Sequence, residues 1–118
     1  MTYKLFHDLL FYAMTSRDYN EFVDGAKKLH DWDDSLMSTG VLFSIWLYSV
    51  DHTSRKIRDF TGLSRAQFAR DYGIPVRTLE NWDLEKASPV PSHLDLLCFA
   101  VLNDVHSAPK KEAEPEAE

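Results

Sequence analysis

Cysteine, glycine and uninterrupted apolar sequence are all scarce in this 118-residue chain. The single cysteine, Cys98, cannot form a disulfide within the chain or a multi-cysteine zinc site, and its apolar surroundings in the sequence favour a core position. The five histidines lie far apart and include no His-x-x-x-His pair. We therefore expect neither a metal site nor a cofactor.

The four glycines are scattered, so no glycine-rich phosphate loop is present in the sequence. A serine nucleophile elbow and a carboxylate pair in a supporting context are also missing. These absences predict that the protein is not an enzyme.

Two further absences bear on location. Residues 1–4 lack a secretory signal pattern. The most apolar stretch, residues 36–50, is shorter than the ~20 residues that a bilayer-spanning helix needs. We expect a cytoplasmic protein that does not enter a membrane.

Positive charge is in deficit overall but not everywhere. The net charge is −6, which by itself opposes contact with nucleic-acid phosphates. Residues 54–77, however, carry six basic side chains against two acidic ones, a local balance of +4. An acidic chain can thus present one basic face to DNA.

Apolar residues recur with a helical period throughout the chain, and no stretch shows the strict alternation of a strand. The sequence therefore predicts an all-α fold. Caps, glycines and prolines place the expected helices at 3–14, 19–30, 36–50, 54–60, 63–72, 75–83 and 93–107.

Three regions are expected: an N-terminal helical region for dimerisation or partner binding (1–53), a second helical region (54–107) and a disordered acidic tail (108–118). The helix over 36–50 is apolar around most of its circumference. It is therefore expected at the centre of the fold, at a subunit interface, or both. We predict a homodimer that uses residues 36–50 or the C-terminal helix.

The stretch from residue 63 to residue 83 has the local signals of two helices joined by a tight turn. Ser64 and Gln67 have the spacing of a capping box that begins the first helix. Gly73 suits a turn position with positive φ, and Pro75 suits the first turn of the next helix. Leu79 and Trp82 would then face inward.

That arrangement leaves Val76, Arg77, Glu80 and Asn81 on the outer face of the second helix. Arginine can donate two hydrogen bonds to guanine, asparagine can pair with adenine, and valine can contact a thymine methyl group. The outer face therefore has chemistry suited to base edges. For Glu80 alone, a solvated surface role is favoured over DNA contact.

The segments Leu63-Ser64-Arg65-Ala66-Gln67-Phe68-Ala69, Gly73-Ile74-Pro75, Arg77-Thr78-Leu79 and Trp82-Asp83, followed by Pro89, resemble the phage-repressor (Cro, XRE) helix-turn-helix family. The resemblance implies a lambda-repressor-like all-α bundle in which residues 54–107 form a helix-turn-helix DNA-binding domain, here with an additional N-terminal helical region. Where that family commonly has a Trp-Glu-x-Gly-like stretch, this chain has Trp82-Asp83-Leu84-Glu85.

The resemblance also implies that the second helix of the motif enters the major groove of double-stranded DNA. The candidate DNA-binding residues are Arg65, Val76, Arg77, Thr78, Glu80 and Asn81. The candidate phosphate contacts are Arg55, Lys56, Ser64 and Arg70.

Three functions remain open from the sequence. The first is a transcriptional repressor of bacterial, phage or mobile-element type, with two second helices about 34 Å apart on one DNA face. The second is an antitoxin or a phage or mobile-element inhibitor that binds a protein partner through its N-terminal helices. The third is a structural adaptor, which would follow if the outward arginines only paired with Glu80, Asp83 and Glu85.

Overall fold

The computed structural model describes residues 1–28 and 39–107, and every regular element in these two ranges is a helix. The all-α prediction is therefore confirmed. The predicted helix residues Leu36 and Met37, the acidic run 31–34 and the tail 108–118 lie outside the described residues. The helices are α1 (Tyr3–Thr15), α2 (Tyr19–Ala26), α3 (Thr39–Val50), α4 (Ser54–Thr61), α5 (Arg65–Tyr72), α6 (Val76–Asp83) and α7 (Pro91–Ser107).

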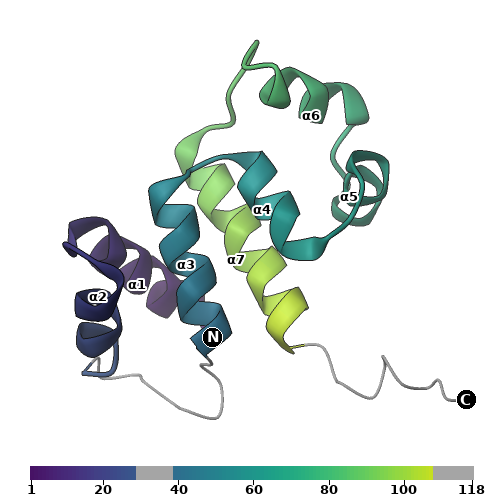
Figure 1. Ribbon diagram of the computed structural model, residues 1–118. Helices are drawn as coiled ribbons and strands as arrows, with labels where there is room; N and C mark the ends of the chain where they lie inside the picture. Colours follow the sequence, from purple (N-terminus) through teal and green to yellow (C-terminus); the bar gives the residue numbers. More distant parts are fainter. Residues whose placement is uncertain (29–38, 108–118) are drawn as a thin grey trace, which may run out of the picture.

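Helices α3, α4 and α7 form the middle of the molecule (Figure 1). Helices α1 and α2 pack beside α3 on one side, whereas α5 and α6 lie on the other side, next to α4. Helix α3 contacts α1, α2, α4 and α7, which gives it the central position expected from its apolar sequence.

One hydrophobic core runs through the described chain, across the predicted boundary between residues 53 and 54. Its fully buried side chains include Phe6, Ile45 and Tyr48 from the N-terminal helices and Ile57 and Leu79 from the later ones. Continuous burial of this kind lets the two predicted regions stabilise each other.

The N-terminal helices are joined by aromatic packing. Phe22 is fully buried and stacks on Trp46, with ring centroids 5.9 Å apart. Tyr19 meets Phe43 edge to face at 5.4 Å. Such ring pairs add to the free energy gained from burial alone.

A close approach between α1 and α2 depends on Gly25. A Cβ atom built at this position would lie 1.9 Å from the hydroxyl oxygen of Tyr12. Glycine is expected to weaken a helix, yet here it lets the Tyr12 ring lie against the backbone of α2.

Local capping explains where most of the helices begin. The side-chain oxygens of Thr2, Asp18, Thr53 and Ser64 each accept a hydrogen bond from a backbone N–H of the helix that follows. Helix α4 ends at Gly62, whose φ of 72° is left-handed.

The helix boundaries differ from the expected ones at the end of α2 and at the start of α7. Helix α2 ends at Ala26, where residues 27 and 28 form a turn with a hydrogen bond from Lys28 N–H to the Gly25 carbonyl. Helix α7 begins at Pro91, because proline fits the first turn of a helix. On α7, Leu102 is fully buried, whereas Val105 near the end of the helix is exposed.

Candidate nucleic-acid interface

The site is built on α5, a short turn and α6, which the sequence predicted as the two helices of the motif. Helix α5 ends at Gly73, whose φ of 68° and ψ of 30° are left-handed. The N–H of Ile74 donates to the Ala69 carbonyl at 3.0 Å, a bond typical of a glycine-closed helix end. The predicted positive φ at Gly73 is thus confirmed.

Helix α6 starts one residue later than expected. Pro75 caps the helix instead of forming its first residue, with φ −59° and ψ 138°. Its carbonyl accepts hydrogen bonds from the N–H groups of Thr78 and Leu79, at 3.0 and 3.2 Å. No side chain caps this helix, so its first N–H groups remain open to a ligand.

Only half of the capping box at the start of α5 is formed. Ser64 Oγ accepts a hydrogen bond from Gln67 N–H at 3.1 Å. The Gln67 side chain turns along the helix instead, donating to Asp71 Oδ1 at 2.7 Å and accepting a bond from Arg70. Because Ser64 Oγ acts only as an acceptor here, its hydroxyl proton is available for donation to a phosphate. Arg70 is bonded to the neutral Gln67 side chain, so its positive charge is not balanced by that partner.

The outer surface of α6 matches the predicted outward set. Val76 and Arg77 are exposed, while Thr78, Glu80 and Asn81 are partly exposed. Leu79 is fully buried, and Trp82 is partly buried against the core. The helix therefore divides into an inner and an outer face as its sequence spacing predicted.

The two arginines predicted to contact DNA have different surroundings. Arg65 Nε donates to Asp83 Oδ2 at 3.1 Å, and its Nη1 lies 3.6 Å from Glu80 Oε2. Arg77 forms no ion pair with any residue of the described ranges. Arg65 is therefore held in place by α6, whereas the Arg77 guanidinium is available to an external partner.

Asp83 forms the centre of an ion-pair network. The adaptor alternative had paired the outward arginines with Asp83, but the sequence analysis missed the contribution of Arg58. The Asp83 side chain is only 7% exposed and lies 3.3 Å from Arg58 Nη2 as well as 3.1 Å from Arg65 Nε. A buried carboxylate needs such partners, because burial without them is costly. The network links α4, α5 and α6, and it accounts for two of the basic side chains in the positive segment.

Residues 58, 65 and 83 carry no shared sequence signal, since they lie on three different helices and helical spacing relates positions only within one helix. The one hint was the acidic charge at Asp83, placed beside the apolar face of α6. The adaptor interpretation, in which the outward arginines pair with acidic residues, thus describes Arg65 and does not describe Arg77.

A second link joins α5 to the C-terminal helix. Tyr72 donates its hydroxyl proton to Asp104 Oδ2 at 2.8 Å, and its ring packs on Phe68 with centroids 4.8 Å apart. The pKa of Tyr72 is raised to about 12. Burial is the largest cause, and the hydrogen bond to Asp104 is the second. The first helix of the motif is thereby positioned against α7.

Two further candidates for phosphate contact, Arg55 and Lys56, lie in the first turn of α4. Arg55 is exposed and Lys56 is partly exposed. Neither forms an ion pair within the part of the chain that the structure describes. Both cations can therefore reach a partner outside the chain.

The turn after α6 has a backbone conformation that usually belongs to glycine. Glu85 has φ 61°, the only positive φ of a non-glycine residue in the described ranges. Its N–H donates to the Trp82 carbonyl at 3.1 Å, and Lys86 N–H donates to the Asn81 carbonyl at 2.8 Å. Glu85 occupies the place of the glycine in the Trp-Glu-x-Gly-like stretch of the phage-repressor family, and it takes the shape a glycine would take.

Within residues 1–28 and 39–107, no cluster of three or more histidine, cysteine or acidic side chains could hold a metal ion. No helix in the same ranges has the length and apolar character required to span a membrane. Cys98 is fully buried, and burial raises the pKa of its thiol.

Comparison with known protein families, curated proteins and solved structures finds no match for this chain. The resemblance to the phage-repressor family therefore rests on the residues themselves, and the function that it implies remains a prediction.

Proposed function

We propose that this protein is a sequence-specific DNA-binding regulator in which α6 enters the major groove. The main support is that α6 is held in place on its inner side, while side chains on its outer side make no ion pair with the described residues. Asp83 anchors α6 to α4 and α5, while Arg77 and Val76 project outward without an ion-pair partner or a buried contact surface. A rigid element with free side chains is what base recognition requires.

The residues divide into distinct roles in this proposal. Arg77, Asn81 and Val76 contact base edges, and Thr78 and Glu80 lie at the margin of the contact. Arg65 serves mainly to orient α6 through Asp83 and Glu80, with its remaining surface toward the DNA backbone. Arg55, Lys56, Ser64 and Arg70 contact phosphates.

The proposal predicts a base-specific role for Arg77. Because the operator is unknown, the wild-type chain is first used to select duplexes from a random DNA library. Arg77→Ala should then weaken binding to the selected duplex by about 1–3 kcal/mol and relax preference at one base pair. Fluorescence anisotropy on the selected duplex and on its single-position variants measures both effects.

Arg17→Ala is the matched control, because Arg17 is an exposed arginine beside α2 whose only ion pair within residues 1–28 and 39–107 is a local one with Glu21. This control should bind the selected duplex as the wild type does. If library selection enriches no sequence, or if Arg77→Ala binds like Arg17→Ala, α6 does not read DNA.

A second activity, binding of a protein partner or of a second copy of the chain, is favoured by apolar side chains on the outer surface of the N-terminal helices. Phe11 and Met14 on α1 and Phe43 and Val50 on α3 are all between about half and three-quarters exposed. Large apolar side chains left in water can mark an interaction surface. A homodimer would also set the spacing of two α6 helices on DNA.

Sedimentation of Phe43→Asp tests this second activity. A charge at the centre of a dimer interface should shift the chain from dimer to monomer, since the carboxylate would lose its hydration on association. Lys28→Asp, an exposed change at the end of α2, controls for added negative charge. Monomeric wild type would favour binding of a different protein over self-association.

A further inference from the structure

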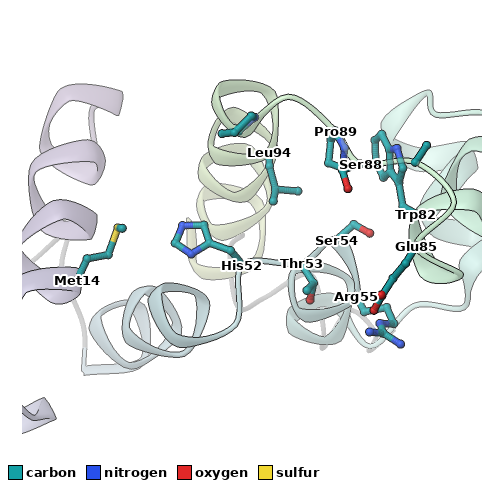
Figure 2. A pocket seen from close by; sticks show the side chains of 12 residues that line it. Met14, His52, Thr53, Ser54, Arg55, Trp82, Glu85, Ser88, Pro89 and Leu94 are labelled. Carbon is teal, nitrogen blue, oxygen red and sulfur yellow. The ribbon is translucent and has the colours of Figure 1, made fainter.

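A cleft of about 630 Å³ opens between the end of α1, the connection from α3 to α4, the end of α6 and the start of α7. Figure 2 shows Met14 and His52 toward one end of it and Trp82 and Glu85 toward the other. Its volume is in the range of small-molecule sites, and its wall combines apolar side chains with a few polar groups.

The polar part of the wall is the first turn of α4. Thr53 Oγ1 caps the N–H of Lys56 at 3.1 Å, which leaves the N–H groups of Ser54 and Arg55 without a partner in the described chain. Unpaired N–H groups at the start of a helix attract an anion.

Ser54 supplies an independent sign that this wall faces a ligand. Its side chain belongs to the wall of the cleft, and the residue is only 5% exposed, yet it has no hydrogen-bond partner among the described residues. In Figure 2 its hydroxyl points into the cleft on the side of Trp82. The hydroxyl oxygen itself is not enclosed by protein atoms, so it is open to the cleft and is suited to bind a polar atom of an occupant.

Charge on the wall limits what the occupant can be. Arg55 lines the cleft and has no ion pair in the described ranges, so it can hold one carboxylate. Glu85 lines the cleft as well, and it would repel a second negative charge. The occupant therefore carries a single anionic group.

The remaining wall is apolar, with Trp82, Leu94 and Pro89 facing the same space (Figure 2). A flat ring would lie well against the indole of Trp82. We propose that this cleft binds a small aromatic monocarboxylate, with its carboxylate on the first turn of α4 and Arg55, and its ring against Trp82, Leu94 and Pro89.

Such a ligand would contact α4 and α7 as well as the end of α6, so the site joins the middle of the fold to the helix proposed to read DNA. The binding itself does not depend on that proposed function. It can therefore be tested without DNA, and either proposal can fail alone.

The experiment is a nuclear magnetic resonance titration of the full chain with benzoate, phenylacetate and cinnamate at millimolar concentration. Benzamide, phenylacetamide and cinnamamide serve as neutral counterparts of matching shape. At least one acid should shift the amide signals of Ser54 and Arg55 and the indole N–H signal of Trp82. Its amide should bind about tenfold more weakly, because the charge-assisted hydrogen bonds are lost.

Ser54→Ala and Arg55→Gln should each weaken binding of that acid by about tenfold. The matched control Arg17→Gln, at an exposed arginine that does not line the cleft, should bind it as the wild type does. A circular dichroism spectrum confirms that each variant is folded. Absence of these shifts for all three acids, equal binding of acid and amide, or unchanged affinity in both cleft variants would overturn the proposal.

Discussion

Helices α1–α3 and helices α5–α6 are stabilised in different ways. Helix α1 alone buries five apolar residues, whereas α5 and α6 together bury three. The motif relies instead on a glycine-closed turn, a serine cap and the Asp83 ion pairs. The difference teaches that a helix pair held by a few directional contacts can leave most of its outer surface free for a partner.

This comparison also predicts a difference in local opening. Regions with few buried apolar contacts open at lower free energy than the core does. We therefore expect amide hydrogens of α5 and α6 to exchange faster than those of α1 and α3. Three changes would break or sharpen this contrast.

The largest effect is expected for Phe22→Ala. Phe22 is fully buried between aromatic neighbours, including Trp46 at 5.9 Å, so its loss leaves a cavity in the N-terminal layer. The free energy of unfolding should fall by about 3–5 kcal/mol. Urea denaturation followed by circular dichroism measures this fall, and a loss below about 1 kcal/mol would mean that the aromatic layer is not the main source of stability.

An intermediate effect is expected for Asp83→Ala. The substitution leaves Arg58, 16% exposed, and the exposed Arg65 without their shared carboxylate. We expect a loss of about 2–3 kcal/mol, below the cost at a fully buried pair because water reaches part of both arginines. Hydrogen exchange should show faster opening of α5 and α6 with little change in α1.

The isosteric variant Asp83→Asn is the companion to this test. It keeps the shape and a hydrogen-bond acceptor but removes the negative charge. If the free energy of unfolding of Asp83→Asn lies between those of the wild type and Asp83→Ala, part of the loss in Asp83→Ala comes from the missing negative charge. If amide hydrogen exchange in Asp83→Ala is accelerated equally in all helices, α5 and α6 do not open independently of the rest of the fold.

The smallest effect concerns alkaline pH. The raised pKa of Tyr72, about 12 against a usual 10, means that the folded state holds this proton more tightly than the unfolded state. Its contribution to stability is therefore complete below pH 10 and is lost as the pH rises toward 12. Burial also raises the pKa of Tyr48, so only the difference from Tyr72→Phe isolates Tyr72.

Tyr72→Phe should consequently lose less stability than the wild type between pH 10 and pH 12. Urea denaturation at pH 8, 10 and 11 measures the difference, and tyrosinate absorbance follows the titration itself. If the two chains lose stability in parallel, the bond from Tyr72 to Asp104 does not position α5.

Local signals in the sequence were sufficient for much of the fold. Ser64 caps α5 and Gly73 closes it, because a cap and a left-handed glycine depend only on neighbouring residues. Leu79 and Trp82 face inward because helical spacing decides the apolar side. The sequence also indicated the outward position of Arg77.

The contacts that hold the candidate site together could not be predicted in this way. Asp83 meets Arg58 and Arg65 only after α4, α5 and α6 have packed, and no spacing rule connects these three positions. The cleft has the same origin, since its wall combines Met14 with Ser54 and Leu94 from distant parts of the chain. Tertiary packing alone brings such residues together.

The left-handed conformation of Glu85 has a consequence for how turns of this kind are recognised. Glycine adopts this shape without strain, whereas a residue with a Cβ atom adopts it at a cost of about 1 kcal/mol. The hydrogen bonds from Glu85 and Lys86 back to α6 are nevertheless formed. A turn of this shape can thus form without the glycine that usually marks it, so a sequence pattern that demands glycine at such a turn would miss a chain that forms it.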